Sequence, residues 1–181
     1  MPDTIYWIEG PWRGRLAILM RPRGGDWLED DVAVWRRAGL DLVVSLLMMD
    51  ESAELGLGRE GEVAHQQGLE YISFPVADRN VPTSWKDAHR LVQQLMARLS
   101  EGKQIGVHCR LGVGRSALLA ASVLVSSAVG VGPAFERIEK ARGCPVPDTP
   151  EQRLWVEQFG TMTVREEEMP TEAGPMVKGA T

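Results

Sequence analysis

A strand, a glycine-rich turn and an apolar helix follow one another between residues 104 and 129, and this unit constrains the fold most strongly. Residues 104–107 form an apolar run of strand length, and residues 116–129 form an apolar run of helix length. The segment 108–116 joins them and reads His-Cys-Arg-Leu-Gly-Val-Gly-Arg-Ser. Because glycine allows a tight backbone turn, the chain is expected to pass directly from the strand into the helix.

Strands and helices are predicted to alternate along most of the remaining chain. Further strands are expected at 5–8, 16–20, 41–47 and 69–74. Capping residues, apolar spacing and glycine stops predict helices at 27–38, 51–55, 59–67, 85–99 and 134–142, and a last helix that ends at Phe159. This alternation predicts an α/β fold with a central, mainly parallel sheet that is flanked by helices on both faces.

The turn at 108–116 has the composition of an anion-binding site. Its backbone N–H groups can converge into a concave nest, and the positive end of the following helix points into it. Arg115 carries a permanent charge and a planar fork of donors that can hold two phosphate oxygens. The predicted phosphate-binding residues are Arg110, Leu111, Gly112, Val113, Gly114 and Arg115.

The same turn carries a candidate nucleophile. A cysteine at a helix N-terminus beside positive groups loses its proton readily, so Cys109 is predicted to attack phosphorus as a thiolate. The hydroxyl of Ser116 is expected to hydrogen-bond to the sulfur and to ease its departure in a later step. His108 precedes the nest on the strand and is expected to order the loop by hydrogen bonding rather than to carry protons.

A second loop, at 74–82, is fixed at both ends by proline. Phosphate esters leave as alkoxides or phenoxides, so their hydrolysis gains from an acid that protonates the departing oxygen. Asp78 is the candidate acid, and Arg79 and Asn80 beside it are candidate substrate contacts. Standing alone, Asp78 would be read as a turn or capping residue, and its pairing with the Cys109 loop favours the acid.

The residues His108, Cys109, Arg115 and Ser116 resemble the signature loop of the cysteine-based protein tyrosine phosphatases. The whole pattern is most similar to their small atypical dual-specificity branch, of the kinase-associated phosphatase kind. The resemblance runs from about residue 5 to residue 159, and only 78–82 and 108–116 are specific. It implies the protein tyrosine phosphatase fold and hydrolysis through a phosphocysteine intermediate, with no cofactor. Ala77 departs from the proline that many members have before the acid.

Other residues are assigned by their place in this pattern. The loop at 143–152 resembles the late glutamine-bearing loop of the family, so Gln152 either orients the attacking water or faces solvent in a first helical turn. Arg21 and Arg23 either lie on a solvated face or contact substrate near the mouth of the site. Cys144 is expected to be a free, half-buried thiol, and a regulatory disulfide with Cys109 is the alternative.

Composition narrows the class of protein. The 181 residues are expected to form one phosphatase domain over 1–160, followed by an acidic, disordered tail over 161–181. A net charge of −5 argues against sequence-independent binding of nucleic acid, so no nucleic-acid partner is expected. No membrane partner is expected either, since the longest apolar run is too short to span a bilayer. The histidines show no metal-ligand spacing, so no metal is expected. A catalytic thiolate, two cysteines in all and no signal peptide predict a cytoplasmic protein.

The predicted function is therefore that of a phosphoprotein phosphatase. Its partners are a phosphorylated protein or peptide substrate and a phosphate or other oxyanion in the loop. The chain has no obvious insertion that would build a deep tyrosine pocket, so a shallow site is expected. Phosphotyrosine is the expected substrate group, and the sequence leaves open the choice between phosphotyrosine alone and dual specificity that includes phosphoserine and phosphothreonine. Two alternatives remain: a catalytically weak phosphopeptide-binding module, and a phosphatase for a non-protein phosphate such as a phosphoinositide or RNA.

Overall fold

The fold is built on one five-stranded sheet. The structure is a computed structural model that describes residues 4–168 of the chain. Its strands follow the spatial order β1-β2-β5-β3-β4, with β1 antiparallel to β2 and the other pairs parallel. The predicted, mainly parallel sheet is thus confirmed. The strands are β1 Ile5–Ile8, β2 Arg15–Leu19, β3 Leu42–Ser45, β4 Glu70–Ser73 and β5 Gln104–His108.

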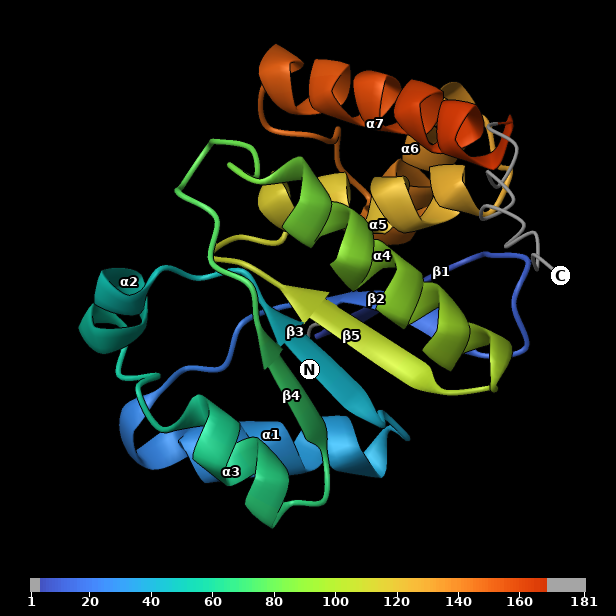
Figure 1. The fold of residues 1–181 in the computed structure, drawn as a ribbon. Helices are drawn as coiled ribbons and strands as arrows, with labels where there is room; N and C mark the ends of the chain where they lie inside the picture. The colour runs from blue at the N-terminus through green and yellow to red at the C-terminus, as the bar shows by residue number, and fades with distance from the viewer. Residues whose placement is uncertain (1–3, 169–181) are drawn as a thin grey trace, which may run out of the picture.

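Helices cover both faces of this sheet, as the sequence predicts (Figure 1). One face packs against α1 and α3, and the other packs against α4, α5 and α6, with α7 packed on α5 and α6. The short α2 lies beyond the end of β3 (Figure 1). The helices are α1 Leu28–Arg37, which follows the 3₁₀ turn η1 Gly25–Trp27, then α2 Met49–Glu54, α3 Glu60–Gln66, α4 Trp85–Ser100, α5 Arg115–Ser126, α6 Val131–Arg142 and α7 Pro150–Glu168.

The central strands are apolar on both faces because each face carries its own core. In β3, Val44 faces the α4–α7 side of the sheet and Val43 faces the α1–α3 side. In β5, Ile105 and Val107 face the α4–α7 side. Runs of apolar residues without alternation are what such doubly covered strands require.

Helix α5 is buried on all sides, since it packs against the sheet and against α4, α6 and α7. Its mean composition is accordingly apolar, and even the polar Ser122 is buried, donating to the carbonyl of Leu118. Because β2 to β5 run parallel, the loops that follow β3, β4 and β5 meet at one edge of the sheet, where α5 begins.

The last helix differs from the expectation. The sequence predicts that it ends at Phe159, yet α7 continues to Glu168. A Cβ at Gly160 would lie 2.5 Å from Cγ1 of Val125, so this glycine permits the close approach of α7 to α5. The expected tail is therefore helical as far as Glu168, and residues 169–181 lie outside the described residues. In the part of the chain that the structure describes, no helix has the length and apolar character needed to cross a bilayer.

Two further glycines, one in a crowded place and one in an open place, give a matched test of how closely the backbone is packed. A Cβ at Gly14 would lie 2.1 Å from the carbonyl oxygen of Lys103, whereas one at Gly132, in the first turn of α6, would meet nothing within 4 Å. Gly14→Ala is expected to lower the free energy of unfolding by about 1–3 kcal/mol through overpacking. Gly132→Ala is expected to raise it by up to about 1 kcal/mol through helix propensity. Urea unfolding followed by circular dichroism measures both, and equal effects would contradict this packing.

Candidate active site

Cys109 lies at the end of β5, where the chain turns into α5. Its side chain is 3% exposed, and its Sγ lies 3.3 Å from Oγ of Ser116 in the first turn of α5. Gly112 in the intervening loop adopts a left-handed φ of 67°, which glycine accommodates without strain. The predicted order of strand, tight loop and helix is therefore present, and the thiol and the hydroxyl meet as expected.

The guanidinium of Arg115 is buried at the foot of this loop, with 2% of the side chain exposed. Its Nη1 and Nη2 donate to the two carboxylate oxygens of Glu51 at 2.7 and 2.9 Å. Nη1 also donates to the carbonyl of Val76 at 2.8 Å and, more weakly, to that of Leu46 at 3.4 Å. One arginine thus joins the loop at 108–116, called the phosphate loop for its predicted ligand, to the loops that follow β3 and β4.

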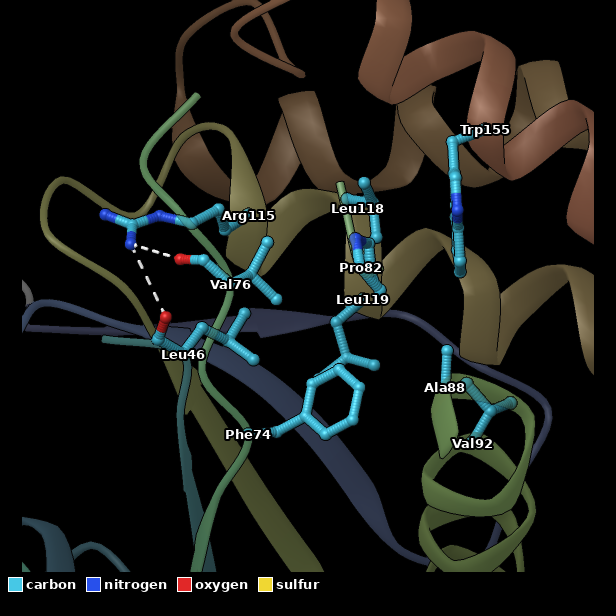
Figure 2. A pocket seen from close by; sticks show the side chains of 10 residues that line it. All are labelled: Leu46, Phe74, Val76, Pro82, Ala88, Val92, Arg115, Leu118, Leu119 and Trp155. Atoms are coloured by element: carbon cyan, nitrogen blue, oxygen red, sulfur yellow. Dashed lines mark hydrogen bonds between the residues drawn. The ribbon is translucent and has the colours of Figure 1, made fainter. Parts of the chain in front are cut away.

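Figure 2 shows where this arginine stands relative to the core. The two carbonyl contacts lie on one side of a small apolar cavity of about 10 Å³, and Ala88, Val92 and Trp155 lie on the other side. The cavity is lined by Leu46, Phe74, Val76, Pro82, Ala88, Val92, Arg115, Leu118, Leu119 and Trp155. The walls are almost wholly apolar, so the charge of Arg115 is balanced by Glu51 and by the loop groups and not by solvent.

The electrostatics of this pair are mutual. Burial works to lower the pKa of Arg115, but the hydrogen bonds to Glu51 and the charges of Cys109, Glu51 and Asp78 outweigh it, so the pKa is raised. The hydrogen bonds from Arg115 hold the pKa of Glu51 below its ordinary value, against the opposing effect of burial. Both groups therefore remain charged at neutral pH.

Asp78 lies within reach of the same arginine. Its Oδ1 is 2.9 Å from Nη2 of Arg115, and its side chain is 58% exposed. Arg79 adopts a left-handed φ of 56°, and the N–H of Asn80 donates back to the carbonyl of Ala77 at 3.0 Å. A tight turn therefore presents Asp78 and Arg79 at the tip of the loop.

The thiol lies under a depression of about 130 Å³. This is smaller than the roughly 300–1,000 Å³ of typical small-molecule pockets, so it suits a phosphate group with a short stem. Leu111 stands at its rim with 64% of the side chain exposed. The lining residues are Asp78, Arg79, Cys109, Leu111, Gly114, Arg115 and Asp148. The depression thus brings together Asp78, Arg79, Cys109 and half of the predicted phosphate-binding residues, and the others, Arg110, Gly112 and Val113, do not line it.

Outer contacts brace the phosphate loop. The guanidinium of Arg142, stacked on the ring of Tyr6, donates to the carbonyls of Gly112 at 2.7 Å and Leu111 at 3.2 Å. The side chain of Arg110 is paired with Glu54 of α2, with N–O distances of 3.0 and 3.5 Å. The guanidinium of Arg142 therefore holds two carbonyls of the loop, and the pair between Arg110 and Glu54 joins the loop to α2.

His108 lies on the opposite face of the sheet from α5. Its ring is fully buried between Trp35 of α1 and Glu60 of α3, with Nε2 at 2.7 Å from Oε1 of Glu60. Tyr71 donates to the other oxygen of Glu60 at 3.2 Å, and burial, followed by the charge of Glu60, raises the pKa of Tyr71. The His108 side chain therefore anchors β5, the strand that leads to Cys109, from the α1–α3 side of the sheet. Within the described residues its ring nitrogens make no hydrogen bond to the loop, so the expectation that it orders the loop in this way is wrong.

Gln152 is fully buried, so the prediction of a solvent-facing residue is wrong. Its side-chain Oε1 accepts from the backbone N–H groups of Asp148 and Thr149 at 3.1 and 3.3 Å. The backbone N–H of Gln152 donates to Oγ1 of Thr149 at 3.2 Å. This is a capping box, and the spacing Thr149-x-x-Gln152 is its sequence signal. The side-chain Nε2 donates to the carbonyl of Asn80 at 3.0 Å.

The remaining assigned residues lie outside the depression. Arg23 pairs with Asp31 at 2.7 Å, and Arg21 donates to the carbonyl of Pro22 at 3.1 Å. The side chain of Asn80 does not line the depression, and its backbone carbonyl is its link to the site. Cys144 is a free, half-buried thiol, as predicted. Within residues 4–168, no group of three or more histidine, cysteine or acidic side chains could hold a metal ion.

Sequence reasoning missed three residues that organise the site: Glu51, Glu60 and Arg142. Glu51 forms a capping interaction at the start of α2 and pairs with Arg115, 64 residues further along the chain. An acidic residue in the first turn of a helix looks the same whether it caps that helix or binds a distant arginine. Only the meeting of the strand ends identifies the partner.

Both the sequence and the fold of the chain are similar to those of known phosphatases. The family described as dual specificity phosphatase, catalytic domain, matches residues 33–158, which is more than half of the chain. Protein 197R of Invertebrate iridescent virus 6, named as a candidate tyrosine phosphatase, is 26% identical over 122 residues. That match covers 66% of this chain and 44% of the viral protein, so the chain spans less than half the length of this relative.

Solved structures share the fold. A kinase associated phosphatase, with its catalytic cysteine replaced by serine, has a TM-score of 0.83 at 18% identity, over 91% of this chain and 97% of that one. Tk-PTP in its active form has a TM-score of 0.72 at 23% identity, over 89% and 99%. PTPMT1 in complex with PI(5)P has a TM-score of 0.73 at 18% identity, over 91% and 99%.

The Glu51–Arg115 pair makes acid stability a test of the site. A carboxyl whose pKa is lowered by folding stabilises the native state above its unfolded pKa, and this contribution is lost as the pH falls through the lower, folded pKa. The free energy of unfolding is expected to fall below about pH 4, and to fall less steeply in Glu51→Gln. Urea unfolding at a series of pH values measures both slopes, and identical slopes would contradict the pairing.

Proposed function

The chain belongs to the dual specificity phosphatase family of catalytic domains, which are cysteine-dependent phosphatases, and on this premise we propose that it hydrolyses phosphate monoesters of proteins through a phosphocysteine intermediate. One observation carries the proposal. The thiol of Cys109 lies 3.3 Å from a hydroxyl at the start of α5, under a depression that Arg115 and Asp78 also line. A nucleophile, an anion site and an acid are thus within reach of one phosphate group.

In the first step, the substrate phosphate enters the depression and its oxygens bind the loop N–H groups and Arg115. The sulfur of Cys109 attacks phosphorus in line, a P–S bond forms, and the P–O bond to the substrate breaks. Asp78 gives its proton to the departing oxygen, so that an alcohol or phenol leaves rather than an anion. The loop N–H groups and the guanidinium stabilise the charge on the equatorial oxygens.

In the second step, water hydrolyses the phosphocysteine. Asp78, now ionised, removes a proton from the water as its oxygen attacks phosphorus, and the P–S bond breaks. The hydroxyl of Ser116, 3.3 Å from the sulfur, stabilises the departing thiolate. Inorganic phosphate is released, and the enzyme returns to its starting state without a cofactor.

Glu51 has a positioning role in this scheme. It engages Nη1 and Nη2 of Arg115 from one side and fixes the plane of the guanidinium. The contact between Asp78 and Nη2 is on the open side of the arginine, since Asp78 is exposed and Glu51 is not. A phosphate dianion therefore competes with Asp78 for Arg115, and its arrival frees the carboxyl to act on the leaving oxygen.

The charge around the depression favours a protein substrate over a phosphoinositide or RNA. Besides Arg115, the lining offers one cation, Arg79, against two carboxylates, Asp78 and Asp148, so it presents no cluster of basic side chains for additional phosphate groups. Arg110, the basic side chain next to the thiol, is already paired with Glu54. A peptide with one phosphorylated residue meets these constraints. The small volume of the depression, about 130 Å³, suits phosphoserine and phosphothreonine as well as phosphotyrosine. A catalytic thiolate suits the reducing cytoplasm.

The roles of the two central residues are tested with an aryl phosphate across the pH range. Cys109→Ser is expected to abolish turnover, and Cys144→Ser, which removes the other free thiol, is expected to retain it. Asp78→Asn is expected to lower turnover by about 10²-fold or more, as the loss of a general acid does, and to flatten the basic limb of the profile. Wild-type protein that binds phosphopeptide without turnover would instead support a binding module.

A substrate panel tests the class of phosphate ester. At equal concentration, kcat/KM is expected to be higher for singly phosphorylated tyrosine and threonine peptides than for a phosphoinositide in vesicles or a 5′-phosphorylated RNA. The lower kcat/KM for the lipid and the RNA is expected because Asp148 repels additional phosphate groups and because Arg110 is already paired with Glu54. Faster turnover of the lipid or the RNA than of every peptide would overturn the choice of substrate but not the phosphatase activity.

A further inference from the structure

We infer that Gln152 is a positioning residue that holds the loop at 74–82, called the acid loop, in place while Asp78 is protonated. This inference rests on the proposed function. Gln152 connects three segments of the site. Its amide hydrogen-bonds to the acid loop at Asn80 and to the start of α7 at Asp148 and Thr149, and it lies close to the phosphate loop at Gly114. The starting point is therefore a buried side chain that links the start of α7 to the acid loop.

The contact with the phosphate loop is a close fit. A Cβ at Gly114 would lie 2.9 Å from Oε1 and 3.0 Å from Nε2 of Gln152. The side chain itself is fully buried, so the amide cannot turn to solvent without breaking these contacts. Its oxygen is fixed by two backbone N–H groups, and this orientation leaves the NH₂ group facing the acid loop.

The amide nitrogen donates to the carbonyl of Asn80, at the end of the turn that presents Asp78. Arg115 also ties this loop to the phosphate loop at two points, through the carbonyl of Val76 at the base of the loop and through the ion pair with Asp78 at its tip. That pair requires an ionised Asp78. A general acid must be protonated, and the incoming phosphate takes the open side of Arg115.

The ion pair is therefore lost in the state that carries out the first chemical step. The hydrogen bond from Gln152 does not depend on the charge of Asp78, because it ends on a backbone carbonyl. It can hold the turn over the depression when the ion pair cannot. An acid that is misplaced by an ångström loses much of its effect, so a fixed turn has a direct consequence for the rate.

This role differs from that of orienting the attacking water, and leaving groups separate the two. The acid matters most when the departing oxygen is a strong base, as in phenyl phosphate, and least when it is a weak base, as in 4-nitrophenyl phosphate. The ratio kcat/KM covers steps up to the release of the leaving group. It reports on the acid and is blind to the later attack of water.

Gln152→Glu is the informative substitution, because a glutamate keeps an oxygen for the capping box and removes the N–H donor to Asn80. We expect kcat/KM for phenyl phosphate to fall about 10-fold, a part of the roughly 10²–10⁴ that an acid contributes, with less than about 3-fold change for 4-nitrophenyl phosphate. Gln158→Glu makes the same change on the exposed side of α7 and is expected to leave both values unchanged.

Other outcomes overturn the inference. A burst of nitrophenol with lowered kcat and unchanged kcat/KM for both esters would assign Gln152 to the water step. Equal loss of kcat/KM for both esters would indicate general damage to the site. Gln152→Met, which also lacks the donor, is expected to repeat the leaving-group pattern if the glutamate variant fails to fold. If wild type turns over neither ester, the proposed function itself fails, which is a distinct result.

Discussion

The buried charge of Arg115 is the constraint on which the rest of the site depends. A guanidinium that is 2% exposed is stable only when its charge and its donors are met within the protein. Glu51 meets the charge, and the carbonyls of Val76 and Leu46 meet further donors. Removing one partner of such a buried pair typically costs about 3–5 kcal/mol, so these segments are obliged to fold together.

The same requirement creates the chemistry. Glu51 comes from α2, Leu46 from the end of β3, Val76 and Asp78 from the loop after β4, and Arg115 from the start of α5. Each lies beyond the carboxyl end of a parallel strand or at the helix that follows one, where an α/β sheet leaves a crevice. In the proposed mechanism, the charge that holds this crevice together also attracts a phosphate into it. The proposed phosphate binding and the stability of the site thus depend on one arrangement of residues.

The sequence predicts the local parts of this arrangement well, because they depend on nearby residues. The strand, glycine turn and helix around Cys109 follow from composition, and the doubly covered strands follow from unbroken apolar runs. The polar pairs that cross the molecule do not, because an acid on a short helix carries no mark of its distant partner. Glu51 and Glu60 were missed for this reason.

Two errors had a different origin. Gly160 was read as a helix stop, when its role is to let α7 approach Val125 of α5. Gln152 was allowed a solvent-facing position, although Thr149 three residues earlier signals a capping box. In the first case packing decided the outcome, and packing is invisible in a single sequence. In the second a readable local signal was available.

The central claim is that the thiol of Cys109 carries the phosphoryl group between the two steps. Rapid acid quench of the enzyme during turnover of an aryl phosphate, followed by peptide mass spectrometry, tests this directly. The account predicts a phosphoryl group on the sulfur of Cys109 in the wild type, at a level that falls when substrate is exhausted. A phosphoryl group found on Ser116 or His108, or on no residue during active turnover, would contradict it.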